Sequence, residues 1–252
     1  MKIIVVSCLL AAWATSPAWA GAPFRTDDPV PTDYQHWEVY GFATGTHKSG
    51  DSSGTAPGVE VDYGAAPDLQ LHAVAPLAYD KPSGSHTKFG PGDAELGFKY
   101  RFVHEDENGW RPAIAIFPAV DLPTGDDDRG LGTGHPHEFL PIWFQKTFGD
   151  WTTDLGGGWW NNPGPGNKNY WFGGWLVTNH VTDDLTIGAE LFHQTADTDG
   201  GKASTGFNLG VIYDLSENYH LLLSAGRGIR NVSATNEFSY YLGFQWRFGP
   251  EE

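Results

Sequence analysis

The stretch Phe238-Ser-Tyr-Tyr-Leu-Gly-Phe-Gln-Trp-Arg-Phe248 decides the fold class of this chain. Large apolar side chains occupy every second position in it, namely Phe238, Tyr240, Leu242, Phe244, Trp246 and Phe248. In an extended strand these side chains share one face, and the other face carries small or polar residues together with Tyr241. A continuous apolar and aromatic face is typical of a strand whose outer side contacts lipid.

The segment from Asp93 to Phe102 repeats this alternation. One of its faces is apolar and consists of Ala94, Leu96, Phe98, Tyr100 and Phe102. A strand of a soluble β-sandwich also alternates, so this pattern alone leaves open which face points outwards.

Alternation with a period of two recurs along the chain, and no long segment has apolar residues at helical spacing. We expect about twelve strands, over residues 34–46, 58–66, 69–79, 93–104, 111–122, 138–148, 151–160, 170–181, 185–197, 203–214, 219–229 and 236–248.

Short turns alternate with longer polar connections between these strands. The short turns are Ala66-Pro67-Asp68, Glu105 to Trp110, Gly149-Asp150, Thr182-Asp183-Asp184 and Ser216-Glu217-Asn218, and the longer connections are 47–57, 80–92, 123–137, 161–169, 198–202 and 230–235. Outer-membrane barrels have short periplasmic turns and long extracellular loops, and closure pairs every strand edge within the hydrocarbon. The sequence therefore predicts an all-β, antiparallel up-and-down transmembrane β-barrel with both termini on the periplasmic side.

Residues 1–20 have the features of a secretory signal peptide. Lys2 supplies the positive charge, residues 3–13 are apolar, and Ala18-Trp19-Ala20 has the form of a cleavage site. The apolar run of about 11 residues is shorter than the roughly 20 that a spanning helix needs. We expect cleavage after Ala20, which leaves residues 21–252 as a single barrel domain. The only cysteine, Cys8, is lost with the signal, so the mature chain has no thiol.

The formal net charge of −16 argues against a nucleic-acid partner, because phosphate binding requires a basic surface. Acidic loops at a bacterial surface explain this charge more simply.

The last strand also resembles the signal that the barrel-assembly machinery reads in outer-membrane proteins. Tyr241, Gly243, Trp246 and Phe248 match its polar-or-Tyr, glycine and aromatic positions. The departure is the tail Gly249-Pro-Glu-Glu252, because the aromatic residue usually ends the chain. We therefore expect the assembly machinery and outer-membrane lipid as partners.

Several strand-and-turn motifs are similar to those of one outer-membrane family. They are Trp37-Glu38, the run from Tyr63 to Leu71, Gly92-Asp-Ala-Glu-Leu-Gly-Phe-Lys-Tyr-Arg-Phe102 and Ala119-Val-Asp-Leu-Pro-Thr-Gly125. The chain resembles the family labelled "putative MetA-pathway of phenol degradation". This resemblance implies a barrel or transporter connected with uptake of aromatic or other hydrophobic compounds, and it implies no catalytic residues.

If the apolar face of each strand contacts lipid, the residues at the alternate positions face the opposite way and line the lumen. The candidate lumen-lining residues are Glu38, Glu60, Asp62, His72, Glu95, Lys99, Arg101, Asp121, Asp154, Glu190, Asp214, His220 and Arg247. Buried charges require partners. They form either an ion-pair network that fills the barrel or a polar conduit that selects solutes by charge, and the strand number alone does not decide between these alternatives.

We expect no metal site and no cofactor. Asp126-Asp-Asp128 lacks calcium-ligand spacing, and the pair His135 and His137 lacks an evident third ligand. Trp159, Trp160, Trp171 and Trp175 flank one long loop, where an interfacial aromatic girdle is a better interpretation than a carbohydrate platform.

No complete catalytic constellation is visible. Ser224 and His220 share one face of a strand, but four residues of strand separate them by about 13 Å. We expect no enzyme, and the leading hypothesis is a passive channel for an unidentified small hydrophobic or aromatic solute. The alternatives are a structural or adhesive barrel with a side-chain-filled lumen and, less favoured, an enzyme at the lipid surface.

Overall fold

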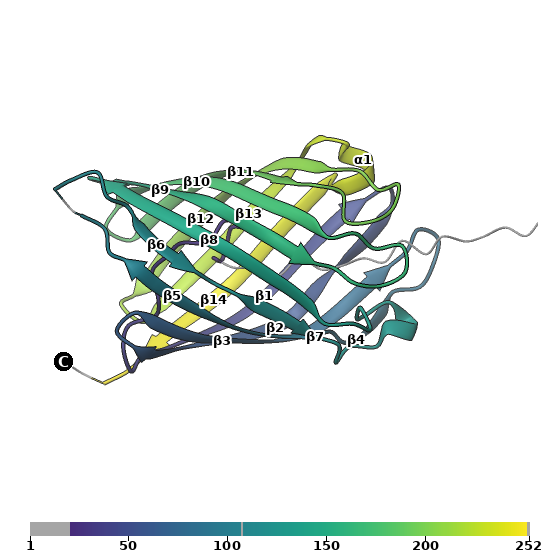
Figure 1. Ribbon diagram of the computed structural model, residues 1–252, viewed down its shortest axis with the longest axis horizontal. Coiled ribbons are helices and arrows are strands. Elements are labelled where there is room, and N and C mark those ends of the chain that lie inside the picture. Colours follow the sequence, from purple (N-terminus) through teal and green to yellow (C-terminus); the bar gives the residue numbers. More distant parts are fainter. Residues whose placement is uncertain (1–20, 107, 251–252) are drawn as a thin grey trace, which may run out of the picture.

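The computed structural model describes residues 21–106 and 108–250, which form a closed antiparallel β-barrel (Figure 1). The predicted signal peptide, residues 1–20, lies outside the described residues. Among the described residues, no helix is both long and apolar enough to cross a membrane.

The strands of the wall follow one another around the barrel in chain order. Their bounds are β1 Trp37–Lys48, β2 Asp51–Ala66, β3 Leu69–Lys81, β4 Lys88–Pro91, β5 Ala94–Val103, β6 Ala113–Ile116, β7 Ala119–Leu122, β8 His137–Phe148, β9 Trp151–Asn161, β10 Tyr170–Thr182, β11 Leu185–Gln194, β12 Ser204–Ser216, β13 Tyr219–Arg230 and β14 Phe238–Phe248. Two short helices, η1 Asp127–Arg129 and α1 Val232–Thr235, lie in connections.

Two of the wall strands are interrupted. β4 and β5 both pair with β3, and β6 and β7 both pair with β8, so each pair is one strand broken by a short irregularity. Counted this way, the described residues form twelve strands, which confirms the predicted number and architecture.

The first and last strands close the barrel. β1 pairs with β14 from Trp37 opposite Phe248 to His47 opposite Phe238. This seam leaves neither strand with an unpaired edge in the hydrocarbon, where unmet backbone hydrogen bonds are costly. Trp37 and Phe248 lie at the same end of the wall, and the predicted periplasmic location of that end stays a prediction.

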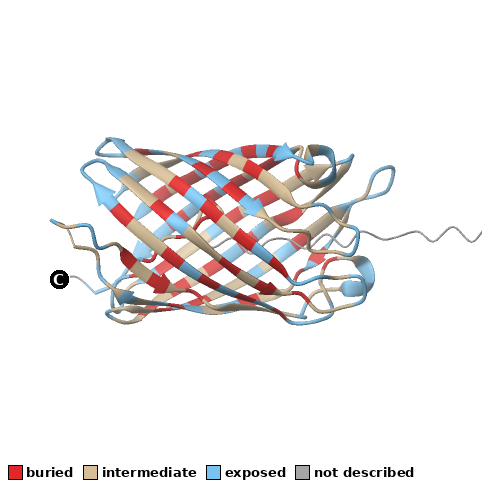
Figure 2. Cartoon of the chain, turned by 45° about the horizontal axis from the view of Figure 1, so that its top comes forward, coloured by how far each residue is buried: buried red, intermediate tan, exposed pale blue. Residues whose placement is uncertain are grey.

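Burial alternates along the strands as the sequence predicted (Figure 2). Leu96, Phe98, Tyr100 and Phe102 of β5 are exposed on the outer surface, as are five of the six apolar side chains of β14. A protein in water would not leave so many large apolar side chains exposed, whereas a lipid-facing wall requires them.

One predicted long connection is wrong. Residues 47–57 are not a loop, because β1 continues to Lys48 and β2 begins at Asp51. Ser49 and Gly50 join them with φ values of 49° and 84°. Two consecutive residues with positive φ form the tight turn that matches strand twist, and the polar residues on either side continue the two strands.

Two ends of the barrel can be distinguished by their connections. The short-turn end contains the turns at Pro67-Asp68 and Gly149-Asp150, and the long-loop end contains the connections between β7 and β8 and between β9 and β10. Trp37 and Phe248 lie at the short-turn end.

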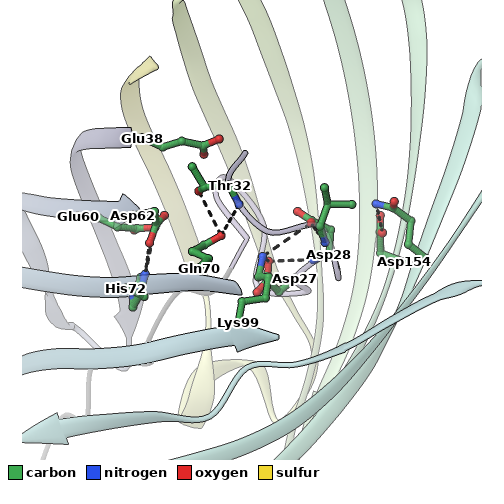
Figure 3. Close-up of polar contacts among 12 residues, drawn as sticks. Asp27, Asp28, Thr32, Glu38, Glu60, Asp62, Gln70, His72, Lys99 and Asp154 are labelled. Atoms are coloured by element: carbon green, nitrogen blue, oxygen red, sulfur yellow. Dashed lines mark hydrogen bonds and ion pairs between the residues drawn. The ribbon is translucent and has the colours of Figure 1, made fainter. Parts of the chain in front are cut away.

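The segment before β1 lies inside the barrel, which the sequence analysis did not anticipate. Residues 21–33, here called the luminal segment, form hydrogen bonds with β3, β5, β11 and β13. These strands lie on different sides of the wall, so a short segment reaches all of them only from the interior. Figure 3 shows Asp27, Asp28 and Thr32 of this segment among the strands.

Candidate functional site: the barrel lumen

Glu190 of β11 anchors the luminal segment. Its carboxylate Oε1 accepts hydrogen bonds from the backbone N–H of Arg25 at 3.0 Å and from the N–H and Oγ1 of Thr26 at 2.5 and 2.7 Å. Its other oxygen accepts from Asn208 Nδ2 at 2.6 Å. Glu190 is only 1% exposed, and these donors replace the water that a buried carboxylate loses.

Inward-facing glycines make room for the segment. A Cβ at Gly188 or Gly210 would lie 2.4 or 2.6 Å from Cζ of Phe24, and one at Gly174 would lie 2.1 Å from Oγ1 of Thr26. Real Cβ atoms do not approach so closely, so these positions form a slot that only glycine leaves open.

Lys99 of β5 binds the segment by charge. Its Nζ lies 3.1 Å from Oδ1 of Asp27 and 3.7 Å from Oδ1 of Asp28, and it lies 5.2 Å from the Phe117 ring centroid. Burial raises the pKa of the Asp27 carboxyl to about 7; Lys99 opposes this rise and Asp28 adds to it. Gln70 Oε1 accepts from the N–H of Thr32 at 2.9 Å (Figure 3).

A buried histidine of β3 links carboxylates of the two strands beside it, β2 and β5. His72 Nδ1 lies 2.6 Å from Asp62 and 3.9 Å from Glu60, and Nε2 lies 2.9 Å from Glu95. One ligand atom each from Glu60, Asp62 and His72 lies within 4.8 Å of the others, which is metal-ligand spacing. Both ring nitrogens already bond carboxylates, so a metal ion would have to replace a hydrogen bond of the imidazole.

A polar clamp holds the seam at the short-turn end. Arg247 of β14 donates to Glu38 Oε1 of β1 from Nε at 3.0 Å and from Nη2 at 2.8 Å. Tyr40 and Gln245 donate to Glu38 Oε2 at 2.6 and 2.8 Å. The clamp joins residues near the two ends of the described chain, 209 positions apart in the sequence.

A cavity of about 410 Å³ lies in the lumen. Its wall includes seven carboxylates, from Asp27, Asp28, Glu38, Glu60, Asp62, Asp154 and Asp214, and two permanent cations, from Lys99 and Arg247. Carboxyl groups outnumber permanent cations in this lining, and those that are ionised give the cavity a negative potential that favours cations.

Eight of the thirteen candidate lumen residues line this cavity, namely Glu38, Glu60, Asp62, Lys99, Asp154, Asp214, His220 and Arg247. Glu190, His72 and Glu95 are buried in the contacts described above. Asp121 pairs across the strands with Glu95. Arg101 instead binds Asp68 at the short-turn end, at 2.9 Å.

Sequence reasoning missed an aromatic cluster inside the barrel. Its buried members are Phe117, Phe139, Trp143, Trp160, Tyr170, Phe172 and Phe192. Trp160 was expected in the outer girdle and is 5% exposed, whereas Trp171 and Trp175 are 61% and 50% exposed on the outer surface. The alternation of the strands could have revealed this cluster, because residues an even number of positions apart share one face. Trp160 therefore shares the inward face with Asp154, and Phe192 shares it with Glu190.

The Arg25 guanidinium lies against this cluster. Its Cζ is 4.7 Å from the Phe172 ring centroid and 4.5 Å from that of Phe192. Its Nη2 donates to Gln194 Oε1 at 3.1 Å. Burial lowers the pKa of Arg25 and Glu190 raises it, and a guanidinium with so high an ordinary pKa stays charged.

The possible catalytic pair is engaged elsewhere. Ser224 Oγ donates to the carbonyl oxygen of Pro23, and His220 Nδ1 bonds Asp214 at 2.6 Å. Both contacts fix structure, the first by holding the luminal segment.

The matched positions of the assembly signal have a structural reason. Tyr241 points inwards and stacks on Phe42 with centroids 5.6 Å apart. A Cβ at Gly243 would lie 2.6 Å from the Tyr241 ring, so the glycine leaves space for that ring.

Known structures share this fold. The COG4313 outer membrane channel from Pseudomonas putida F1 has a TM-score of 0.70 and 16% identity, covering 87% of this chain and 97% of that chain. The KdgM porin has a TM-score of 0.57, 12% identity and coverages of 84% and 99%. The NanC porin has a TM-score of 0.56, 10% identity and coverages of 85% and 100%.

At sequence level, the family model described as "Putative MetA-pathway of phenol degradation" matches residues 37–248. No curated protein matches the chain. The structural neighbours are outer-membrane channels and porins, and at their low identities they show the fold alone.

Proposed function

This chain belongs to the family described as "Putative MetA-pathway of phenol degradation", and from this premise and the barrel structure we propose that it is a passive outer-membrane channel for small hydrophobic or aromatic compounds. The observation that carries the proposal is the cavity of about 410 Å³ enclosed by a lipid-facing barrel wall. Small-molecule sites are concave and combine apolar walls with a few placed polar groups.

The lumen supplies surfaces of both kinds. Its aromatic cluster offers ring faces to an apolar solute, and the carboxylates of the cavity offer polar contacts beside them. The candidate lumen residues are proposed as the lining of this route. No cofactor is required, because the solute moves down its own gradient.

The location proposal follows from the same architecture. We propose that residues 1–20 direct export and are removed, that residues 21–252 form one domain, and that the assembly machinery inserts the barrel through β14 with the short-turn end in the periplasm. The exposed apolar wall supports contact with outer-membrane lipid.

The test is planar-bilayer recording of the purified protein together with solute uptake by a deletion strain. We expect discrete conductance steps, and we expect the deletion strain to take up a hydrophobic aromatic solute more slowly than its complemented parent. No conductance together with unchanged uptake contradicts the channel.

A second candidate function is a structural or adhesive barrel with a filled lumen. The observation that favours it is the luminal segment, whose Phe24 and Thr26 are 2% and 1% exposed. Replacing residues 21–33 with a Gly/Ser segment of equal length separates the two candidates. A channel conducts in the wild type with the segment docked, and the replacement only raises its conductance. A barrel that the segment fills conducts only after the replacement.

The enzyme alternative has the least support. The structural neighbours are channels and porins, and the hydroxyl of Ser224 is bonded to backbone rather than to an imidazole. We propose that the protein performs no catalysis, and a hydrolase assay with lipid and ester substrates tests this.

A further inference from the structure

We propose that Phe172, Phe192 and Gln194 form a binding site for a small organic cation of the guanidinium type, and that the Arg25 side chain occupies this site in the resting barrel. The proposal rests on the proposed channel function and names a solute class for one site in its lumen.

The geometry of the site is that of an aromatic cation site. The Arg25 Cζ lies 4.7 and 4.5 Å from the centroids of two rings on neighbouring strands, β10 and β11. Distances within about 6 Å give a favourable interaction between a cation and a ring face. Two rings around one guanidinium make a site that prefers a charged, planar group to a neutral one.

A fixed acceptor completes the site. Gln194 accepts the Arg25 Nη2 hydrogen bond through Oε1, while its Nε2 donates to Asp197 Oδ2 at 3.2 Å. Asp197 therefore orients the amide of Gln194 so that its oxygen faces the cation. An amide held in this way accepts from any guanidinium or ammonium that replaces Arg25.

The rest of the lumen favours positive charge. The carboxylates of the cavity outnumber its permanent cations, and Lys99 also lies over a ring of the aromatic cluster. Strongly hydrated metal ions gain little from ring faces, whereas weakly hydrated organic cations gain from both the rings and the negative potential.

Arg25 occupies the site from a segment that is not part of the wall. The segment is held by hydrogen bonds and ion pairs at Glu190, Gln70 and Lys99 rather than by strand pairing. A competing cation could replace the guanidinium without breaking the barrel. Arg25 then acts as an internal competitor that sets the concentration at which a solute binds.

The test measures binding, so it does not depend on transport. Purified full-length Arg25→Ala protein is titrated with ethylguanidinium and with its neutral near-isostere ethylurea, using calorimetry. We expect ethylguanidinium to bind at least about tenfold more tightly to Arg25→Ala than to the wild type, with no such gain for ethylurea. Arg227→Ala, a change at an exposed arginine of β13, is the matched control and should bind as the wild type does.

Conservative variants test the rings. In the Arg25→Ala background, Phe172→Leu and Phe192→Leu keep an apolar side chain but remove a ring face, and each should weaken ethylguanidinium binding about three- to tenfold. Equal binding of the cation and the neutral probe, or unchanged affinity in both Leu variants, overturns the site.

Flux through the wild-type protein separates this inference from the channel proposal. Proteoliposome uptake of benzylguanidinium is compared with uptake of neutral benzylurea. Passage of both at equal rates, without preferential binding of the cation, leaves the channel standing and rejects the cation site. Preferential cation binding to Arg25→Ala without flux of either compound through the wild type supports the site and contradicts the channel.

Discussion

At the scale of single residues, absent side chains matter as much as present ones. Gly174, Gly188 and Gly210 face inwards, and each lies against Thr26 or Phe24 of the luminal segment. Glycine in a strand costs stability through backbone entropy and lost packing. Here the missing side chains leave space for another part of the chain.

Gly174→Ala should loosen the luminal segment. The new Cβ would lie 2.1 Å from Thr26 Oγ1 and displace the hydroxyl that binds Glu190. We expect faster hydrogen exchange at the backbone amides of residues 25 and 26. Gly173→Ala is the neighbouring control, because its Cβ would meet the nearest atom at an ordinary 3.6 Å. Equal exchange in the two variants would contradict the slot.

Asp27 makes docking of the segment dependent on pH. Burial raises the pKa of its carboxyl to about 7, above the ordinary value of 3.8. A carboxyl whose pKa is raised in the docked state binds a proton on docking. Docking is therefore strongest below the ordinary pKa of 3.8, weakens as pH rises from there to about 7, and stays constant above that value. The charged and titratable groups around it are Lys99, Asp28, Glu60 and Asp154.

The check compares the wild type with Asp27→Asn, which mimics the protonated acid at every pH. Hydrogen exchange of the segment should be similar in the two proteins at about pH 3.5, below the ordinary pKa of 3.8, and faster in the wild type at pH 8. Taking the ratio of the two proteins at each pH removes the intrinsic pH dependence of exchange. A ratio that stays constant across this range would refute the coupling.

At the scale of strands, the inward and outward faces could be predicted from the sequence. Side chains alternate with a period of two, and lipid and lumen require different residue types on the two faces. In β5, Glu95 and Lys99 point inwards while Leu96 and Phe98 point outwards, as expected. The prediction of a loop over residues 47–57 was wrong because a polar strand without alternating apolar residues has the same sequence features as a loop. The prediction for Trp160 was wrong because it was assigned to the girdle from its place near a strand end, without considering which face of the strand it lies on.

The luminal segment could not be predicted from periodicity. It has neither helical nor strand pairing, and its contacts with Glu190 and Ser224 span 164 and 201 residues of sequence. The candidate lumen residues were found by parity, but their grouping into an anchor, a histidine network and a seam clamp depends on which strands meet across the barrel.

Glu38→Gln should weaken the seam between β1 and β14. It removes the charge from a carboxylate that accepts two hydrogen bonds from Arg247. Because Arg247 is partly exposed, we expect a loss of only about 1 kcal/mol in the free energy of unfolding. Urea unfolding in detergent measures it, with Glu217→Gln in an exposed turn as the control. An equal loss in both variants would show that the clamp contributes nothing specific.

At the scale of the whole molecule, charge and shape act together. The acidic residues behind the net charge of −16 are not confined to surface loops, because seven of them line the luminal cavity. Low-dielectric walls around such a cavity strengthen its potential. The acidic composition that the sequence analysis assigned to loops therefore also belongs to the interior.

Ion selectivity tests this distribution. In a bilayer with a potassium chloride gradient, the reversal potential should show preference for K⁺ over Cl⁻, and the preference should weaken at high salt because of screening. Asp214→Asn should reduce it, whereas neutralising Asp127 and Asp128 in the β7–β8 connection should have less effect. Anion preference in the wild type would contradict an acidic conduction route.

The position of Gly21 has a consequence for protein engineering. Gly21 lines the cavity, so a tag or label attached directly ahead of it would begin inside the lumen of the barrel. Such a fusion would have to thread along the lumen or pull the segment out of its slot. A tag placed after β14, which ends at the short-turn end, avoids this conflict. Comparing the two fusions would therefore report on the luminal segment as well as on the tag.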